Sequence, residues 1–287
     1  MHSAFASGKL ILCGEHAVVH GHPALAFAVS LGTTVRLVPH DGPTGVIGGA
    51  ADSTLQHALI TALGEHGWQV QIDSTLPMGR GMGSSAALAT ALVRARALAQ
   101  GEFLSREAQF DAAMGLELIF HANPSGVDVA VSVRGGVLRY QRDAQGEPQV
   151  SALTCPDWQV VVLDTGVAGH TARLVAEVSA RRPGIDPYLH RIGMLVEQAA
   201  QHLHDPAVLG PILNENQAML DQIGVSTPEV DALVSLARGH GALGAKLSGA
   251  GGGGVVMALV HDPAPLLDAA ASAGVPAWAC RPAPATS

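Results

Sequence analysis

The chain has 287 residues and a formal net charge of −8, the balance of 16 Lys and Arg against 24 Asp and Glu. This acidic balance disfavours a protein that binds nucleic acid by neutralising its phosphates. A hydrophobic content of 48% excludes an intrinsically disordered chain, and no apolar run approaches the roughly 18–20 residues of a membrane span. We therefore expect a globular protein with no nucleic acid and no membrane among its partners.

The N-terminal segment and the cysteines favour a cytoplasmic protein. A signal peptide is not expected, because the apolar stretch 10–13 is short and Glu15 follows it closely. Cys13, Cys155 and Cys280 show no CxxC spacing, which favours reduced, buried cysteines over a disulfide framework or a zinc module.

In the first half of the chain, apolar periodicity and turn residues predict a series of strands and helices. Strands are expected over residues 4–12, 24–29, 33–39 and 68–73, and helices over 52–66, 86–100 and 105–121. Gly135 and Gly136 lie between two apolar segments, which predicts a hairpin turn within residues 127–142.

In the second half, a strand over residues 158–164 is followed by helices over 171–182, 188–204 and 209–223. After Pro228 the pattern predicts a helix, strands over 243–247 and 255–260 around a glycine loop, a helix over 265–273 and a last strand over 277–280. These mixed runs indicate an α+β fold. The polar stretch 145–156 predicts a boundary between two domains, residues 1–150 and 151–287.

The strongest local signal is a run of alternating glycines that opens a helix. Glycines let backbone N–H groups approach a ligand, and a helix N-terminus adds free donors and a positive dipole end. We expect a phosphate cradle, although the run matches neither the P-loop nor the dinucleotide fingerprint. The alternative is a plain turn with Ser84 as an ordinary N-cap. The run consists of Pro77, Gly79, Gly81, Met82, Gly83, Ser84, Ser85 and Ala86 with the residues between them.

A second glycine cluster, residues 249–254, lies between two segments that are typical of buried strands. A tight loop between buried strands is suited to close approach by a ligand. The alternative is a slack linker, which the apolar flanks LGAKL and VVMALV disfavour.

Glu117 and Asp128 form a third candidate site. Mg²⁺ prefers carboxylate, hydroxyl and phosphate oxygens, and phosphoryl transfer uses an Asp that accepts or orients the proton of the attacking hydroxyl. The alternative for Asp128 is a capping box that begins at Ser125. Gly135 and Gly136 leave little room for a long helix behind such a box.

Lys9, Glu15 and His16 lie around a short apolar strand near the N-terminus. His16, His20 and His22 could be proposed as zinc ligands, but neither an HExxH motif nor a cysteine pair supports a zinc site. Since a lone Lys at the start of a strand is usually only solvated, spacing alone assigns Lys9 no role.

Together these segments resemble the three motifs of the GHMP small-molecule kinases, in the order in which that family carries them. The motifs are Gly8-Lys9 with GEHAVVHG over 14–21, PMGRGMGSSA over 77–86 and KLSGAGGGG over 246–254. The resemblance covers most of the chain. GEHAVVHG and the segment from Glu117 to Asp128 are similar to the mevalonate kinases rather than to galactokinases or homoserine kinases.

The resemblance implies a two-lobed α+β fold, with an N-terminal lobe like the second domain of ribosomal protein S5 and a ferredoxin-like C-terminal lobe. It implies ATP and Mg²⁺ as cofactors and mevalonate as the small-molecule substrate. The reaction would be direct, in-line phosphorylation of the 5-hydroxyl of mevalonate in isoprenoid biosynthesis. Dimers are common among these kinases, so a homodimer is an expectation of the same kind.

The resemblance also implies roles for single residues. Asp128 matches the catalytic base, and Lys9 matches a lysine whose ammonium stabilises that carboxylate and the reacting oxygen. Ser85 and Glu117 match the Mg²⁺ ligands, and the run from Pro77 to Ala86 would bind the phosphates of ATP. The substrate site would contain Lys9, Glu15, His16, Asp128, Thr171, Gly249 and Ala250.

Three positions depart from the family pattern. Ser7 replaces a Pro, Ala122 replaces a Gly, and Gly169 stands where many mevalonate kinases carry an arginine near the substrate. If that arginine pairs with the substrate carboxylate, another cation is needed, and Arg139 is the first candidate, with Arg134 second.

Two alternative functions stay open on the sequence. One is another GHMP kinase that acts on phosphomevalonate, a sugar or an amino-alcohol. The other is a non-catalytic ligand sensor on the same fold. The presence of Lys9, Ser85, Glu117 and Asp128 disfavours a sensor, because a sensor needs no base.

Overall fold

The computed structural model describes residues 1–49, 51–77, 79–121, 124–169 and 171–285, with the backbone alone for residues 171 and 172. Its first sheet has the order β3-β4-β2-β5-β6, with β1 paired to β2 beside this path. The β3–β4 pair is parallel and the other pairs are antiparallel. The strands are β1 (His2–Cys13), β2 (Ala24–Pro43), β3 (Gly45–Val46), β4 (His66–Ser74), β5 (Val137–Arg142) and β6 (Pro148–Leu153).

A second sheet follows in the C-terminal half of the chain. Its order is β10-β7-β9-β8, and its neighbouring strands run antiparallel. The strands are β7 (Gln159–Asp164), β8 (Gly244–Ser248), β9 (Val255–Val260) and β10 (Ala277–Cys280). The chain leaves the first sheet at Leu153 and enters the second at Gln159.

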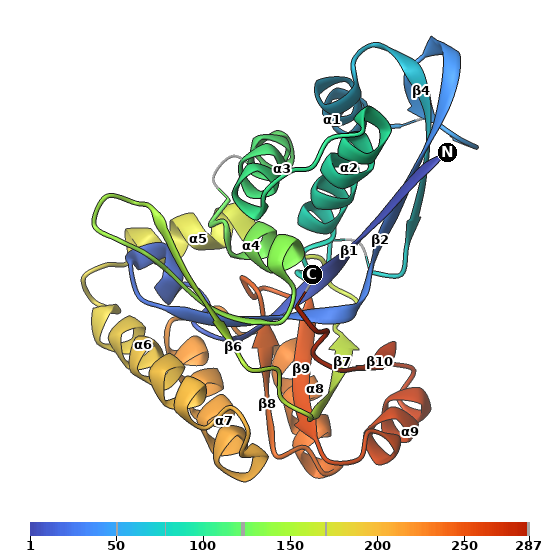
Figure 1. The fold of residues 1–287 in the computed structure, drawn as a ribbon. Helices are drawn as coiled ribbons and strands as arrows, with labels where there is room; N and C mark the ends of the chain where they lie inside the picture. Colours follow the sequence, from blue (N-terminus) through green and yellow to red (C-terminus); the bar gives the residue numbers. More distant parts are fainter. Residues whose placement is uncertain (50, 78, 122–123, 170, 286–287) are drawn as a thin grey trace.

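Helices cover the outer faces of both sheets (Figure 1). Helices α1–α4 lie on one side of the first sheet, and the second sheet with α6–α9 lies on its other side. The helices are α1 (Ser53–Leu63), α2 (Ser84–Gln100), α3 (Arg106–Phe120), α4 (Val127–Arg134), α5 (Thr171–Ala180), α6 (Asp186–Gln201), α7 (Pro206–Gln222), α8 (Pro228–Gly239) and α9 (Ala264–Ser272), with a short 3-10 helix η1 (Ala17–His20). Among the described helices, none is long and apolar enough to cross a membrane.

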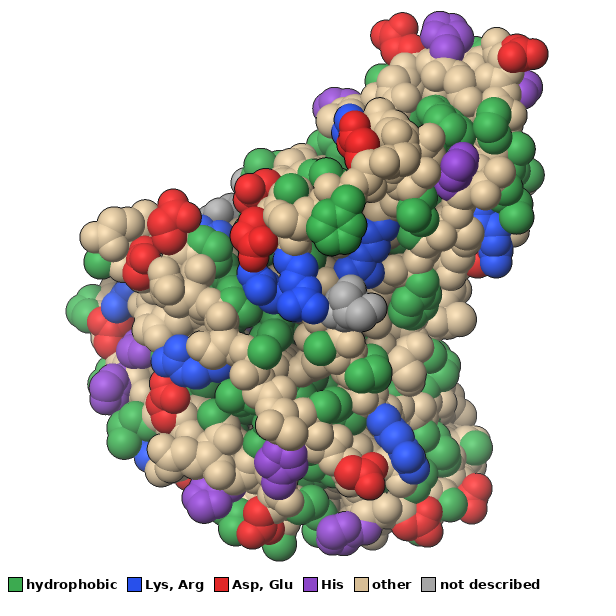
Figure 2. Space-filling model, viewed as in Figure 1, with side chains coloured by type: hydrophobic (Ala, Val, Ile, Leu, Met, Phe, Trp, Pro, Cys, Tyr) green, Lys and Arg blue, Asp and Glu red, His purple; other side chains and the backbone are tan. Residues whose placement is uncertain are grey.

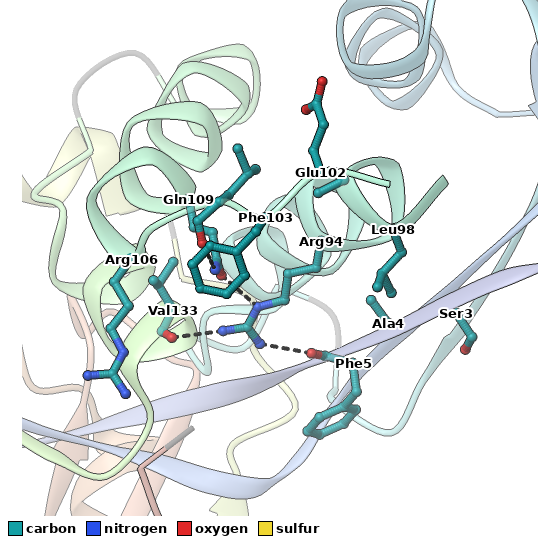
Figure 3. A pocket seen from close by; sticks show the side chains of 12 residues that line it. Ser3, Ala4, Phe5, Arg94, Leu98, Glu102, Phe103, Arg106, Gln109 and Val133 are labelled. Carbon is teal, nitrogen blue, oxygen red and sulfur yellow. Dashed lines mark hydrogen bonds between the residues drawn. The ribbon is translucent and has the colours of Figure 1, made fainter. Parts of the chain in front are cut away.

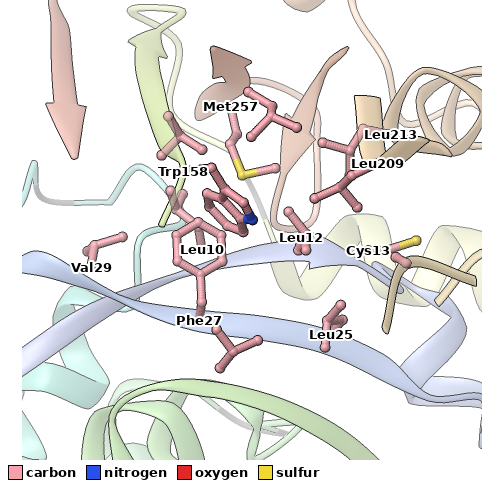
Figure 4. Packing of buried hydrophobic residues seen from close by; sticks show 14 of the residues in the cluster. Leu10, Leu12, Cys13, Leu25, Phe27, Val29, Trp158, Leu209, Leu213 and Met257 are labelled. Carbon is pink, nitrogen blue, oxygen red and sulfur yellow. The ribbon is translucent and has the colours of Figure 1, made fainter. Parts of the chain in front are cut away.

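The two sheets share a hydrophobic core (Figure 4). Leu10 and Leu12 of β1 and Phe27 of β2 pack in one cluster with Trp158 and Met257 of the C-terminal half. The rings of Phe27 and Trp158 meet edge to face, with centroids 5.2 Å apart. Burial of each of these side chains stabilises the fold by about 1.5–3 kcal/mol. The shared core therefore fixes β1 against the C-terminal sheet.

The α+β prediction is confirmed, while two strand predictions need correction. Residues 24–29 and 33–39 belong to one long strand, β2, which pairs with β5 near Ala24 and with β4 near Thr33. Residues 148–153, expected in a polar boundary, form β6, whose side chains are largely exposed and so lack an apolar pattern.

The predicted hairpin within residues 127–142 is wrong, because Val127–Arg134 forms helix α4. Its residues are buried on almost every side, so the sequence VDVAVSVR carries no amphipathic helical period. The expectation of buried cysteines holds for Cys13 and Cys280, whereas Cys155 is exposed.

Candidate active site

Lys9 and Asp128 meet at the centre of the candidate site. The Lys9 Nζ atom lies 3.2 Å from Asp128 Oδ1, and it donates a 3.1 Å hydrogen bond to the Gly81 carbonyl. The Lys9 side chain is 3% exposed and that of Asp128 is 33% exposed. A ligand can therefore reach the carboxylate, while the ammonium behind it is enclosed.

A glycine next to Lys9 lets β1 approach the glycine run. The pairing of β1 with β2 shifts register between Ser7 and Lys9, and the Lys9 amide donates to the Met82 carbonyl at 3.0 Å. A Cβ on Gly8 would lie 2.4 Å from Leu76 Cδ2 and 2.9 Å from the Met82 oxygen. Only glycine fits this close contact, which aims Lys9 at the site.

Asp128 lies in the first turn of α4, which begins after Gly126. Gly126 has a left-handed φ of 87°, and a Cβ there would lie 2.7 Å from the Tyr140 hydroxyl. That hydroxyl donates to the Ser125 carbonyl at 2.8 Å, which holds the turn. Since Gly126 is the N-cap, the capping-box interpretation of Ser125 and Asp128 is wrong.

Ser85 and Glu117 form an oxygen-rich pair beside this centre. The Ser85 hydroxyl donates to Glu117 Oε1 at 2.8 Å, and His121 Nε2 lies 3.2 Å from the same hydroxyl. Glu117 Oε2 is buried and has no hydrogen-bond partner among the described residues. Burial, with a smaller contribution from the Asp128 charge, raises the pKa of Glu117 to about 7, although the Ser85 hydrogen bond and Lys9 oppose the shift.

This pair fits a hard divalent cation. An enclosed carboxylate with one unused oxygen is stabilised by a cation, and a hydroxyl is a suitable second ligand. Within the described part of the chain, no group of three or more His, Cys, Asp or Glu side chains is arranged to hold a metal. Ser85 and Glu117 would therefore share a cation with phosphate and water oxygens, and the zinc interpretation of the N-terminal histidines gains no support.

The glycine run leads directly into the N-terminus of α2. Gly79, Gly81 and Gly83 all have positive φ, at 69°, 80° and 69°. Gly83 is the N-cap and Ser84 the first helical residue, so the interpretation of Ser84 as N-cap is wrong. A Cβ on Gly83 would lie 3.1 Å from Lys9 Cγ. The free amides of the first helical turn thus lie beside Lys9, as an anion site requires.

The second glycine loop packs against the first, so it is not a slack linker. A Cβ on Gly81 would lie 3.2 Å from the Ser248 carbonyl, and the Ser248 hydroxyl accepts a 2.9 Å hydrogen bond from the Ile11 amide. Arg80 Nε pairs with Asp164 Oδ2 at 3.1 Å. The crevice between the loops is lined by Gly79, Arg80, Gly81, Gly169, Ser248, Ala250, Gly251, Gly253 and Gly254.

His16 reaches this second loop in a strained backbone conformation, with φ at 57°. Its Nε2 atom is 2.8 Å from the Ala250 carbonyl, so Nε2 carries the proton and Nδ1 is left as an acceptor. Nδ1 is buried, and no described group hydrogen-bonds to it. Burial, with a smaller contribution from Arg181, lowers the pKa of His16, which keeps the imidazole neutral near pH 7.

Glu15 lies beneath His16 in a buried polar network. Its Oε1 atom pairs with Lys246 Nζ, and Asn216 Nδ2 donates to its Oε2 atom at 3.3 Å. Lys246 also donates to the Leu247 carbonyl at 2.6 Å. The side chains of Glu15 and Lys246 are 1% and 0% exposed. The structure therefore gives Glu15 no surface for a substrate and places it as a support for His16.

The structure does not bring Arg139 to the Lys9–Asp128 pair. Its guanidinium binds Glu197 through Nε and Nη2, at 3.1 and 2.6 Å, and Gln141 through Nη2 at 2.9 Å. Arg134, the second candidate, pairs with Glu107 at 3.2 Å. In the described structure, carboxylates of this chain already pair with both arginines, and the role of Arg139 as partner of the substrate carboxylate stays a prediction. The side chain of Thr171 lies outside the described residues.

The sequence analysis did not single out Lys246 or Asp164. Lys246 interrupts the apolar strand LGAKL, and Asp164 ends the apolar strand WQVVVLD. A charge in or beside a buried strand implies a buried partner, which is the signal that would have found both.

The site combines a buried lysine, an aspartate that a ligand can reach, a helix N-terminus and a carboxylate suited to bind a cation. This combination defines a site for phosphoryl transfer to a small molecule. The comparisons agree with this class. The family model described as the N-terminal domain of GHMP kinases matches residues 46–136, and that of the C-terminal domain matches residues 195–275. The fold is shared with a Lactococcus lactis galactokinase, with a TM-score of 0.75 at 18% identity over 99% of this chain and 94% of that one.

Two further comparisons identify the family within the GHMP kinases. The mevalonate kinase of Pyrococcus horikoshii is 37% identical, over 89% of this chain and 88% of that protein. The crystal structure of L. major mevalonate kinase in complex with R-mevalonate superposes with a TM-score of 0.85 at 26% identity, over 98% of this chain and 96% of that one. The chain belongs to the mevalonate kinase family of the GHMP kinases.

Proposed function

We propose that the protein transfers the γ-phosphoryl group of ATP to the 5-hydroxyl of mevalonate, in isoprenoid biosynthesis. The observation that carries this proposal is the contact between Lys9 and the half-open Asp128, beside the N-terminus of α2 and the Ser85–Glu117 pair. The relatives named above support mevalonate as the acceptor.

Asp128 orients the substrate hydroxyl and accepts its proton as the oxygen attacks. Lys9, held between Asp128 and the Gly81 carbonyl, stabilises the charge that develops on the reacting oxygen. Transfer is direct and in line, so catalysis is positioning and charge neutralisation.

The residues from Pro77 to Ala86 bind the phosphates of ATP through backbone amides of the glycine run and of α2. Ser85 and Glu117 hold Mg²⁺, which, when bound, neutralises phosphate charge. Residues 1–150 thus carry the phosphate and metal site, and residues 151–287 close the substrate side.

The substrate binds between Asp128 and the second glycine loop. His16 fixes the second glycine loop through its contact with the Ala250 carbonyl, and Gly249 and Ala250 form the backbone surface that faces the substrate. Thr171 contributes from the start of α5. The enzyme acts in the cytoplasm, without nucleic-acid or membrane partners, and forms a homodimer.

The test is mass spectrometry of the products after incubation with ATP, Mg²⁺ and one acceptor at a time. We expect mevalonate to gain one phosphoryl group, in an amount equal to the ADP released. Phosphomevalonate, galactose and homoserine are the comparison acceptors. Turnover of one of these in place of mevalonate would reassign the substrate, and nucleotide binding without any phosphorylated product would favour a sensor.

A further inference from the structure

The glycine run before α2 carries a single side chain between two glycines. Gly79 and Gly81 flank Arg80, and both have left-handed φ values, 69° and 80°. Glycine loses more conformational freedom on ordering than any other residue, so a backbone of this kind is costly to hold in one conformation. Arg80 is therefore the side chain that can anchor residues 79–81 to the rest of the protein.

The helix that follows is fixed in a different way. Arg94, on α2, donates to Gln109 Oε1 of α3 at 2.9 Å. It also donates to the Phe5 carbonyl of β1 at 3.0 Å and to the Val133 carbonyl of α4 at 2.7 Å (Figure 3). These bonds lie in the wall of a cavity of about 340 Å³, which none of the proposed roles in phosphoryl transfer uses. The body of α2 is thus tied to three neighbouring elements, and the glycine run in front of it needs an anchor of its own.

Arg80 reaches an enclosed carboxylate of the C-terminal half. Its Nε atom lies 3.1 Å from Asp164 Oδ2, and the two side chains are 23% and 9% exposed. Arg80 Nη1 is buried, and no described group hydrogen-bonds to it. Among the described residues, Asp164 is thus the group that neutralises this guanidinium and holds it in place.

Asp164 is itself fixed on several sides. It ends β7, an inner strand of the second sheet. Its backbone amide donates to the Pro276 carbonyl at 2.9 Å, and its Oδ1 atom accepts from the Gly166 amide at 2.8 Å. The next residue, Thr165, donates through its amide and its hydroxyl to the Gly254 carbonyl, at 3.0 and 2.8 Å. Asp164 is therefore a rigid support for Arg80.

The residue after Arg80 contacts the reacting centre directly. The Gly81 carbonyl accepts the 3.1 Å hydrogen bond from Lys9 Nζ, and the same Nζ atom lies 3.2 Å from Asp128 Oδ1. Displacement of residues 79–81 would remove this acceptor and uncover Lys9, whose side chain is only 3% exposed. A continuous series of contacts thus runs from Asp164 through Arg80 and Gly81 to Lys9.

We propose that Arg80 and Asp164 are positioning residues for phosphoryl transfer. Their ion pair holds the Gly81 carbonyl in place, and this carbonyl orients Lys9 toward Asp128. The inference rests on the proposed role of Lys9 in catalysis, but the position of Lys9 can be measured without ATP or an acceptor. Loss of the pair should uncover Lys9 whichever acceptor the kinase uses.

The test uses the lysine content of the chain. Lys9 and Lys246 are its only lysines, and their side chains are 3% and 0% exposed. A short pulse of reductive methylation, followed by mass spectrometry of the peptides, reports on each lysine separately. In Arg80→Met and in Asp164→Asn, Lys9 should be labelled about fivefold faster than in the parent, because the loop over it opens locally, while Lys246 stays protected.

Activity should change together with the labelling. In both variants kcat should fall about tenfold or more, since Lys9 is misplaced at the reacting oxygen. Asp164→Asn keeps an acceptor for the Gly166 amide, so it removes the charge with little other change. The double variant should be no worse than the more affected single variant, because both substitutions break the same pair. Arg80→Lys, which keeps the charge, should recover part of the loss.

The control is an exposed ion pair, Arg36 with Asp73, whose side chains are 34% and 51% exposed. Such pairs are spread over the surface, where Figure 2 shows basic and acidic side chains next to one another. Since exposed pairs contribute little, Arg36→Met should change neither the labelling of Lys9 nor kcat.

Three results would overturn the proposal. Unchanged labelling of Lys9 in both variants would show that the pair does not position this side chain. Equal gains in labelling at Lys9 and Lys246 would show that the pair only supports the fold as a whole. A low kcat in Arg80→Met with a normal kcat in Asp164→Asn would show that Arg80 acts on a ligand and not through Asp164.

Discussion

Two lysine–carboxylate pairs lie near β1, and they differ in their access to solvent. Lys9 on β1 pairs with Asp128, whose side chain is 33% exposed. Glu15, just beyond the end of β1, pairs with Lys246, and both of these side chains are almost fully enclosed. The same chemical pair therefore occurs once where a ligand can reach the carboxylate and once where nothing can.

The difference separates the proposed reacting pair from a supporting one. Asp128 keeps carboxylate surface that a ligand can contact, whereas Glu15 has one oxygen bound by Lys246 and the other by Asn216. A buried pair with all its polar atoms satisfied contributes position rather than reactivity. Glu15 and Lys246 thus hold the end of β1 against β8, which places His16 at the second glycine loop.

Asp128→Asn removes the carboxylate of the proposed reacting pair and should have the largest effect on activity. The amide keeps the shape of the side chain but cannot accept the substrate proton, so kcat should fall by about 10²–10⁴-fold. Steady-state kinetics with mevalonate and ATP measures this. Circular dichroism checks that the variant is folded, because loss of the charge paired with the enclosed Lys9 should lower its urea unfolding midpoint. Asp143→Asn, at an exposed turn, is the matched control and should keep full activity. Near-normal kcat in the Asp128 variant would remove Asp128 as the base.

Lys246→Met breaks the supporting pair and should act on stability. Removal of one partner leaves Glu15 as a buried, uncompensated charge, which typically costs about 3–5 kcal/mol. Urea unfolding followed by circular dichroism measures the loss.

The double variant Lys246→Met with Glu15→Leu tests the physical cause of that loss. Because it removes both charges, it should recover most of the free energy of unfolding that the single variant loses. If the double variant is no more stable than the single one, the loss comes from packing at β8 and not from the stranded charge. KM for mevalonate should stay raised in the double variant, because His16 loses its support.

The family and the fold class were predictable from the sequence because glycine is required where backbones nearly touch. Gly8, Gly81 and Gly83 each fill a position where a Cβ would lie within 3.2 Å of another group, so the motifs that contain them mark the site directly. Most helices followed from apolar periodicity. Helix α4 did not, because it is buried on almost every side and shows no period.

The pairing of distant charges was not predictable from one sequence. Lys246 and Glu15 are 231 residues apart along the chain, and only the fold shows that they meet. The same limit applies to Arg139. The need for a cation near a carboxylate substrate was argued from the motif, but nothing in the sequence showed that Glu197 of α6 occupies that guanidinium.

Ser85→Ala tests whether the oxygen pair next to Asp128, Ser85 and Glu117, binds Mg²⁺. The variant loses one proposed Mg²⁺ ligand and the hydrogen bond to Glu117. Since a hydrogen bond to a charged group contributes about 1.5–3 kcal/mol, the Mg²⁺ concentration for half-maximal rate should rise about tenfold or more. Titration of the rate with Mg²⁺ at fixed ATP measures this. Ser84→Ala, one residue earlier, is the control and should shift it less. An unchanged Mg²⁺ requirement in the Ser85 variant would exclude Ser85 as a ligand.

Glu117 is a third carboxylate near these two pairs. It is enclosed, as Glu15 is, but no described lysine contacts it. Its ionisation should therefore appear as a pH dependence of the free energy of unfolding. Burial raises its pKa to about 7 from an ordinary 4.5, so the folded state holds a proton that the unfolded state has lost between these values. Without Mg²⁺ and nucleotide, the stability that this group contributes should be complete below about pH 4.5 and should be lost as the pH rises through 7. Urea unfolding of the parent and of Glu117→Gln across this pH window measures how much of the pH dependence of stability comes from Glu117, because the variant cannot ionise at this position. Parallel stability curves would show that the pKa of Glu117 is not raised in the folded protein, and this prediction would then be wrong.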